Sequence, residues 1–173
     1  MAVCPNNEEI IVLKKKESKW VVEDVLKEVI YLSIIIILYS FSKHDQLVTG
    51  LDWCKKTDKI ISCSMDRNAY VWACDRNGKW TPSLATLRLS KGATCVAWNN
   101  EGTKFAAGCS DGTVVVGHYE AENDWWLCKH LKVDTKHTIT TINWHPSGID
   151  LVVGSIDGTV ITVSGYIKAV DKE

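Results

Sequence analysis

The chain has 173 residues, of which 46% are hydrophobic and 24% are charged, and its formal net charge at pH 7 is −1. This composition is ordinary for a soluble globular domain. Because 20 lysines and arginines are balanced by 21 aspartates and glutamates, the charge gives no basis for predicting binding to nucleic acid or to an anionic membrane surface.

The chain begins with the end of a unit that recurs further along. Residues 4–7 (Cys-Pro-Asn-Asn) are turn-forming, and residues 19–22 (Lys-Trp-Val-Val) have the aromatic and β-branched side chains of a strand. Asn7 stands where an aspartate stands in the later units. We therefore expect residues 1–28 to form the end of a first structural repeat.

The second predicted segment, Val29–Ser42 (VIYLSIIIILYSFS), carries no charge. It lengthens the step from Asn7 to Asp66 to 59 residues, against 45 and 46 for the later steps, a surplus of about 14. A membrane span is disfavoured because it requires about 20 apolar residues, and a signal-peptide core because the run starts far from the N-terminus. The favoured hypothesis is an insertion from a translated intron. If the run is made, we expect an exposed, β-prone segment that promotes aggregation.

Residues 43–173 contain three further copies of the unit. Their tryptophans fall at 53, 98 and 144 and their turn aspartates at 66, 111 and 157, so the spacing from tryptophan to aspartate is 13 residues in every copy. Self-similarity at a period of about 45 residues is typical of repeat architectures. The three aligned segments are Thr49–Trp72, Thr94–Gly117 and Thr140–Val163.

Each unit predicts four strands. Two alternating apolar and polar runs are followed by a turn and a third apolar run, and a fourth strand opens at a tryptophan between units, as at Trp80. In Asp111-Gly112 and Asp157-Gly158 we expect the positive φ angles of two-residue hairpin turns. Four strands per period describe one propeller blade.

The predicted fold class is therefore all-β, a propeller of about three and a half blades. Residues 1–28 end the first blade, residues 29–42 are the insertion, and residues 43–173 form blades two to four. Because an incomplete ring leaves two apolar blade faces open, we expect the chain by itself to be poorly soluble.

The second unit resembles WD-repeat proteins, in which a histidine, a serine or threonine, a turn aspartate and a tryptophan form a hydrogen-bonded tetrad. Its candidates are His44, Ser62, Asp66 and Trp72. Such a tetrad satisfies polar groups that would be costly to bury alone. The third and fourth units keep only Asp111 and Asp157, so we expect those blades to be held by apolar packing and turn geometry alone.

Less repetitive strings resemble a narrower family, the WD-repeat subunits of the actin-related protein 2/3 complex. They are residues 65–72 (MDRNAYVW), 122–130 (ENDWWLCKH), 143–146 (NWHP) and 166–170 (YIKAV). The resemblance implies a seven-bladed propeller and a non-catalytic scaffold in the cytoplasm and actin cytoskeleton. Its implied partners are the other subunits of the complex and actin filaments, and its implied role is support of branched-filament nucleation. The alternative is a generic WD-repeat adaptor of a ubiquitin ligase or signalling complex.

No enzymatic site is expected. His44 beside Asp66 is a candidate acid–base pair, as are His137 and His145, but the tetrad accounts for His44 and no nucleophile stands at a recognisable elbow. The odd number of cysteines, seven, without a Cys-x-x-Cys pair predicts reduced thiols in the cytosol. Cys128-Lys129-His130 lacks a second ligand pair at zinc spacing, so we expect neither a metal nor a cofactor.

Five residues are the candidates for partner contact. Adjacent side chains on a strand point to opposite faces, so one of the Trp125-Trp126 pair is expected to pack between blades and the other to face outward. An outward aromatic ring is a typical interface anchor. The candidates are Arg67, Asp124, Trp125, Trp126 and Lys129.

Overall fold

The computed structural model describes residues 1–3, 10–16, 19–25, 28–29, 40–41 and 43–171. Within these ranges the chain forms sixteen strands and no helix. The strands are β1 Ala2–Val3, β2 Ile11–Lys16, β3 Lys19–Val25, β4 Glu28–Val29, β5 Ser40–Phe41, β6 Val48–Cys54, β7 Lys59–Ser64, β8 Asn68–Cys74, β9 Trp80–Thr86, β10 Ala93–Trp98, β11 Lys104–Cys109, β12 Val114–Glu120, β13 Trp125–Leu131, β14 Ile139–Trp144, β15 Asp150–Ser155 and β16 Val160–Ser164.

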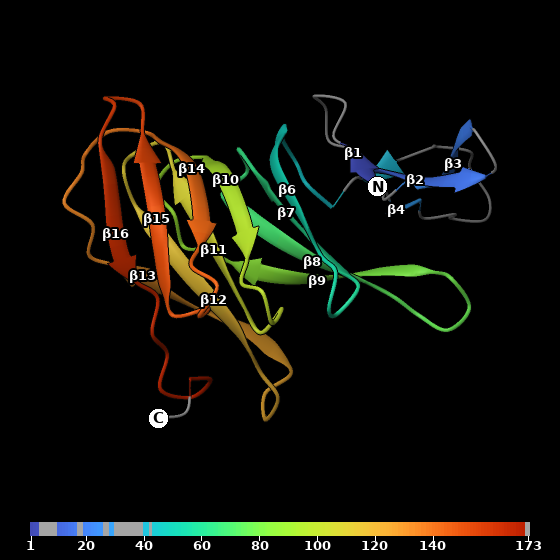
Figure 1. The fold of residues 1–173 in the computed structure, drawn as a ribbon. Helices are drawn as coiled ribbons and strands as arrows, with labels where there is room; N and C mark the ends of the chain where they lie inside the picture. The colour runs from blue at the N-terminus through green and yellow to red at the C-terminus, as the bar shows by residue number, and fades with distance from the viewer. Residues whose placement is uncertain (4–9, 17–18, 26–27, 30–39, 42, 172–173) are drawn as a thin grey trace.

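Each of the repeated units forms one antiparallel sheet whose strands follow chain order. The sheets are β6-β7-β8-β9, β10-β11-β12-β13 and the three-stranded β14-β15-β16. We call them the second, third and fourth sheets, after the units that form them. Their first strands lie next to one another, since β10 contacts both β6 and β14, and Figure 1 shows the sheets stacked side by side as an arc. This arrangement is that of a partial β-propeller, and the all-β propeller prediction is confirmed.

The N-terminal strands form two smaller sheets, β1-β2-β3 and β4-β5. Of the predicted insertion, the structure describes only Val29, Ser40 and Phe41. Glu28 pairs with Phe41 and Val29 with Ser40, so the chain on the two sides of residues 30–39 lies side by side. The rest of the predicted insertion lies outside the described residues, and the intron hypothesis stays a prediction.

Two apolar clusters join neighbouring sheets. Between the second and third units, buried side chains of β7, β8 and β9 meet Phe105 and Trp126 from the next sheet. Between the third and fourth units, Val114 and Val116 meet Ile142 and Trp144. Because successive side chains on a strand point to opposite faces, the central sheet β10–β13 buries both faces, one on each neighbour.

The turns at the aspartates differ from the expected two-residue form. The N–H of Gly112 donates to the carbonyl of Cys109 (3.2 Å), and the N–H of Cys109 donates to the carbonyl of Thr113 (2.9 Å). Only Gly112, at φ 88°, is left-handed, and Asp111 is not. The connection therefore has three residues, a tight turn followed by one left-handed residue, and the two-residue prediction is wrong. Gly158, at φ 85°, repeats the geometry.

Candidate interaction surface

The four residues of the predicted tetrad are brought together beside the β7–β8 turn. His44 Nδ1 lies 2.8 Å from the Asp66 carboxylate, and His44 Nε2 lies 2.8 Å from Ser62 Oγ. The indole N–H of Trp72 donates to Ser62 Oγ at 2.9 Å. Because the carboxylate can only accept, we infer that His44 donates from Nδ1 and accepts the Ser62 proton at Nε2. The chain links the segment before β6 to strands β7 and β8.

These hydrogen bonds matter for stability because the groups that form them are buried. His44, Ser62 and Trp72 expose 1%, 0% and 3% of their surface, and an unpaired polar group at such a site is destabilising. Tyr70 closes the group from the side, with its ring 4.9 Å from the His44 ring, edge to face. The polar groups of His44, Ser62 and Trp72 are therefore shielded from solvent within the second sheet.

Burial raises the pKa of Asp66, but the hydrogen bond from His44 and those from the N–H groups of Asn68 and Asp45 outweigh it and hold this pKa below its usual value of 3.8. A carboxyl group whose pKa is lower in the folded state adds stability above its unfolded pKa, and this stability is lost as the pH falls through the folded value. We expect unfolding titrations below pH 4 to show a loss of stability that the Asp66→Asn variant lacks. An identical acid profile for the two proteins would contradict the assignment.

The third unit replaces the tetrad with different residues. Ser90, on the connection before β10, donates to the Asp111 carboxylate, in the role that His44 has for Asp66. Gly117 stands where the tetrad tryptophan would be, and the ring of Phe105 fills that space, since a Cβ on Gly117 would lie 2.3 Å from it.

The fourth unit keeps a weaker version of the contact. His137 Nε2 lies 3.8 Å from the Asp157 carboxylate, and 61% of the His137 side chain is exposed. Asp157 also accepts from the N–H and hydroxyl of Thr159 at 3.0 and 2.7 Å. The expectation that apolar packing and turn geometry alone hold the later blades is therefore wrong for the third unit, where Ser90 binds Asp111 from the preceding connection. In the fourth unit the hydrogen bonds of Asp157 stay within its own turn.

The candidate contact residues do not form one site. Arg67 is exposed on the β7–β8 turn, at φ 72°, whereas Asp124 lies on the β12–β13 turn. The first turn is the second of its sheet, and the other is the third of the neighbouring sheet. Because successive turns of an antiparallel sheet alternate between its two ends, these two turns lie at opposite ends of the strands. Lys129 is exposed within β13. We call the end with Asp66, Asp111 and Asp157 the aspartate end and the other the far end.

As expected, one ring of the Trp125-Trp126 pair is buried and the other is exposed. The buried one is Trp126, so its prediction as a partner contact is wrong. Trp126 exposes only 7% of its surface, and its ring lies 5.6 Å from the rings of Trp98 and Phe105. It packs between the second and third sheets, so nearly all of its surface is unavailable to a partner. Trp125 is 51% exposed.

Trp125 is held in place by the β12–β13 turn. Its indole N–H donates to the Glu120 carboxylate at 2.6 Å, and Asn123 donates to the same carboxylate. These two hydrogen bonds keep the pKa of Glu120 below its usual value. The hydroxyl of Tyr119 donates to Asp124, whose backbone is left-handed at φ 54°. The turn therefore presents the ring in one orientation.

A groove of about 320 Å³ runs beside Trp125, between the outer strands β9 and β13. Trp125 pairs with Glu120, and Leu127 pairs with His118. Glu120 and His118 lie on the same face of β12 as Val116, which packs against the fourth sheet. Trp125 and Leu127 are therefore on the face of β13 that is directed toward the fourth sheet. The described part of the fourth sheet consists of the three strands β14, β15 and β16. The lining residues are Leu84, Thr86, Arg88, Trp125, Trp126, Leu127 and Cys128.

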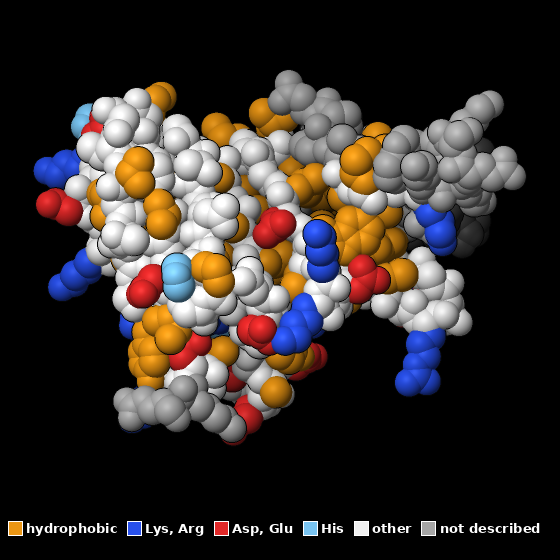
Figure 2. All heavy atoms as spheres, in the orientation of Figure 1, with side chains coloured by type: hydrophobic (Ala, Val, Ile, Leu, Met, Phe, Trp, Pro, Cys, Tyr) orange, Lys and Arg blue, Asp and Glu red, His pale blue; other side chains and the backbone are white. Residues whose placement is uncertain are grey.

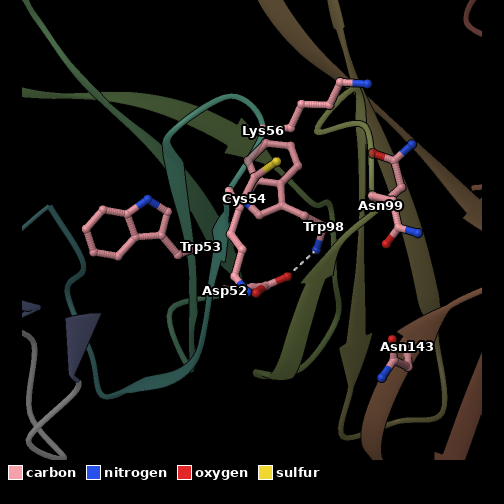
Figure 3. A pocket seen from close by; sticks show the side chains of 9 residues that line it. Asp52, Trp53, Cys54, Lys56, Trp98, Asn99 and Asn143 are labelled. Atoms are coloured by element: carbon pink, nitrogen blue, oxygen red, sulfur yellow. Dashed lines mark hydrogen bonds between the residues drawn. The ribbon is translucent and has the colours of Figure 1, made fainter. Parts of the chain in front are cut away.

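A second hollow, of about 490 Å³, lies at the far end between the β6–β7 and β10–β11 turns. Figure 3 shows Asp52 inside it, with its carboxylate accepting from the N–H of Trp98 at 2.7 Å. Lys56 and Glu101 form an ion pair between these turns. Asp52 and Lys56 thus join the second sheet to the third.

The Cys128-Lys129-His130 string does not converge on a metal. Burial raises the pKa of the Cys128 thiol to about 12, and His130 Nε2 lies 2.9 Å from the carbonyl oxygen of Leu87. Among the described residues, no group of three or more His, Cys, Asp or Glu side chains has the geometry to hold a metal ion.

In the part of the chain that the structure describes, no helix has the length and apolar character needed to cross a membrane. Charged side chains of both signs are intermixed on the visible face, with hydrophobic patches between them (Figure 2). This face therefore shows no concentrated basic field.

Three stretches of the chain, residues 36–73, 82–116 and 128–161, match the family model described as WD domain, G-beta repeat. These stretches contain β5–β7, most of β8 and β9, all of β10 and β11, the start of β12, the end of β13, all of β14 and β15, and the start of β16. The match therefore covers the repeated unit that the tryptophan and aspartate spacing predicted.

Curated relatives give the narrower resemblance. Actin-related protein 2/3 complex subunit 1A-A of Xenopus laevis is 38% identical over 173 residues, which is 100% of this chain and 42% of the relative. Subunit 1 of Schizosaccharomyces pombe is 42% identical over 132 residues, 76% of this chain and 35% of the relative. Subunit 1 of Saccharomyces cerevisiae is 39% identical over 138 residues, 80% and 36%. The predicted resemblance is confirmed, and the chain spans less than half the length of these relatives.

Proposed function

The chain belongs to the WD-repeat family, and from that premise we propose that it is a non-catalytic scaffold subunit of the actin-related protein 2/3 complex. In this role it supports the nucleation of branched actin filaments through contacts with other subunits and with actin filaments, in the cytoplasm and actin cytoskeleton. The observation that carries the proposal is identity of 37–38% to subunit 1 along 99–100% of the chain, in an animal and a plant.

The geometry supports a scaffold because the polar groups that could do chemistry are engaged in holding sheets and turns. The side chains of His44 and Asp66 are bonded to each other and expose only 1% and 5% of their surface, and Asp52 binds the next sheet. What the chain offers to solvent instead is aromatic and aliphatic surface, at Trp125 and Leu127. A rigid stack of sheets with an oriented aromatic anchor suits protein binding.

Affinity purification from a cell extract tests the proposal. The tagged chain is recovered from an extract that contains the complex, and its partners are identified by mass spectrometry. We expect the two actin-related proteins of the complex and its other subunits among these partners. Recovery of ubiquitin-ligase or signalling components, without any actin-related protein, would contradict the proposal and favour a generic adaptor.

We propose Trp125 as an anchor of the partner contact. The Trp125→Ala variant removes a half-exposed ring without opening the core, so recovery of the complex should fall about tenfold or more, as for an interface hot spot. The matched control is Ile156→Ala, which removes a side chain that is 69% exposed at the aspartate end. Equal recovery with the two variants would remove Trp125 from the contact.

A further inference from the structure

Lys104, at the start of β11, is fully buried, which is unusual for a lysine. Its Nζ lies 2.7 and 2.6 Å from the two carboxylate oxygens of Asp171 and 3.0 Å from the carbonyl oxygen of Gly165. It also lies 5.2 Å from the centre of the Trp144 ring. A buried ammonium group requires this kind of pairing, and all of these partners come from the fourth unit.

The segment Gly165–Asp171, which we call the strap, is shaped around this cation. The N–H groups of Val170 and Asp171 donate to the carbonyl of Ile167, and the N–H of Ile167 donates back to the Asp171 carboxylate at 2.7 Å. The carboxylate is thus fixed by its own turn before it meets Lys104. Figure 1 shows the chain leaving β16 at the far end of the sheets and running toward the C-terminus there.

The strap also has a fitted seat on the fourth sheet. The N–H of Gly165 donates to the carbonyl of Ile149 at 2.7 Å. A Cβ on Gly165 would lie 2.7 Å from two carbons of the Trp144 ring and 2.8 Å from Leu151, so only glycine permits the approach. Ile167 packs against the apolar cluster between the third and fourth sheets.

The surroundings of Lys104 leave it dependent on Asp171. His118 is opposite Lys104 in the β11–β12 register and is 7% exposed. Burial lowers the pKa of His118; Glu120 and Asp171 act in the opposite direction, and Lys104 lowers it further. A second cation is therefore disfavoured beside Lys104, and Asp171 is the carboxylate in direct contact with its ammonium group.

We propose that Gly165–Asp171 is a latched strap, with Lys104 and Asp171 as the latch, that locks the fourth sheet onto the third and opens without unfolding the sheets. The strap adds a buried charge pair to a contact between the two sheets that otherwise consists of an apolar cluster and neutral hydrogen bonds, such as the one from the Trp144 indole N–H to the carbonyl of Ala97. Opening exposes Trp144 and the Lys104 cation at the far end. The device is independent of the proposed function, since it concerns the packing of this chain alone.

Limited proteolysis with trypsin tests the latch, because Lys168 is exposed on the strap and its peptide bond is cut only when the strap leaves its seat. In the full chain carrying Asp171→Asn, cleavage after Lys168 should be at least about tenfold faster, since the latch is broken. Cleavage after Lys136, on the connection before β14, should be unchanged. Asp134→Asn, a matched change at an exposed aspartate, should alter neither rate. Equal acceleration at both lysines, or no acceleration, would overturn the proposal.

Hydrogen exchange on the unmodified chain gives a second test that does not depend on any variant folding. If the strap opens by itself, the N–H groups of Gly165, Val170 and Asp171 should exchange faster than those of Ala106 and Val153 in the sheets. Exchange of all five at one common rate would show that the strap opens only when the whole domain unfolds, and would refute a separate device.

Discussion

Replacing Phe105 with alanine is expected to lower the free energy of unfolding by about 3–5 kcal/mol, the usual cost of removing a buried aromatic ring. Phe105 is fully buried, and its ring centre lies 5.9 Å from that of Trp98 and 5.6 Å from that of Trp126. It also fills the space above Gly117. The cavity left by the variant would open in the seam between the second and third sheets. Urea unfolding followed by circular dichroism measures the change.

A matched aromatic gives the control. Tyr119 is on the same sheet but is 41% exposed, so Tyr119→Ala should lose much less stability. The complementary change tests the fit directly: Gly117→Ala should be destabilising by itself, and Phe105→Leu should relieve part of that loss. If Phe105→Ala were no more destabilising than Tyr119→Ala, the ring would not be the packing substitute for a tetrad in the third unit.

Replacing His44 with alanine is expected to lower the free energy of unfolding by about 3 kcal/mol, because it leaves two buried partners, Asp66 and Ser62, each short of a hydrogen bond. Both atoms of the His44 ring that can bond are engaged at 2.8 Å. The loss should be coupled to that of Ser62→Ala, so the double variant should be less destabilised than the sum of the two single changes. Chemical denaturation of the four proteins measures this coupling.

The fourth unit supplies the control for the tetrad. His137 occupies the corresponding place beside Asp157, but at 3.8 Å and with 61% of its side chain exposed. An exposed pair of this kind adds little stability, so His137→Ala should leave the unfolding midpoint unchanged within error. A loss equal to that of His44→Ala would show that burial does not distinguish the two units.

Much of the fold was predictable because it depends on spacing. The constant separation of Trp53 from Asp66, and of Trp98 from Asp111, placed the strands and turns of each sheet. The tetrad was equally accessible, because His44 and Ser62 lie at offsets from Asp66 that recur in WD-repeat proteins. These features are set by local periodicity and turn chemistry, which a single sequence displays.

Other features depend on contacts between distant segments. Ser90 takes the place of a histidine beside Asp111, and a serine on a connection has no pattern that marks it. The pairing of Phe105 with Gly117 requires knowing that their side-chain positions face each other across β11 and β12. Lys104 and Asp171 are 67 residues apart, and each alone reads as a surface charge. Only the three-dimensional arrangement brings such pairs together.

The turn at Asp111-Gly112 shows a different limit. An Asp-Gly pair is compatible with a two-residue hairpin, but the strand register sets a three-residue connection in which Gly112 alone is left-handed. Trp126 is similar, since alternation predicts that one ring of the pair is buried but not which one. In both cases the local pattern allows two answers, and the packing of neighbouring strands selects one.

We propose that this chain of stacked sheets is a subunit of the actin-related protein 2/3 complex, and its sedimentation in a cell extract tests this claim most directly. Fractions from a velocity gradient are probed for the tagged chain and for both actin-related proteins. We expect the chain to sediment with the actin-related proteins, at the size of the assembled complex. Sedimentation apart from them, alone or in particles that contain neither actin-related protein, would contradict the claim.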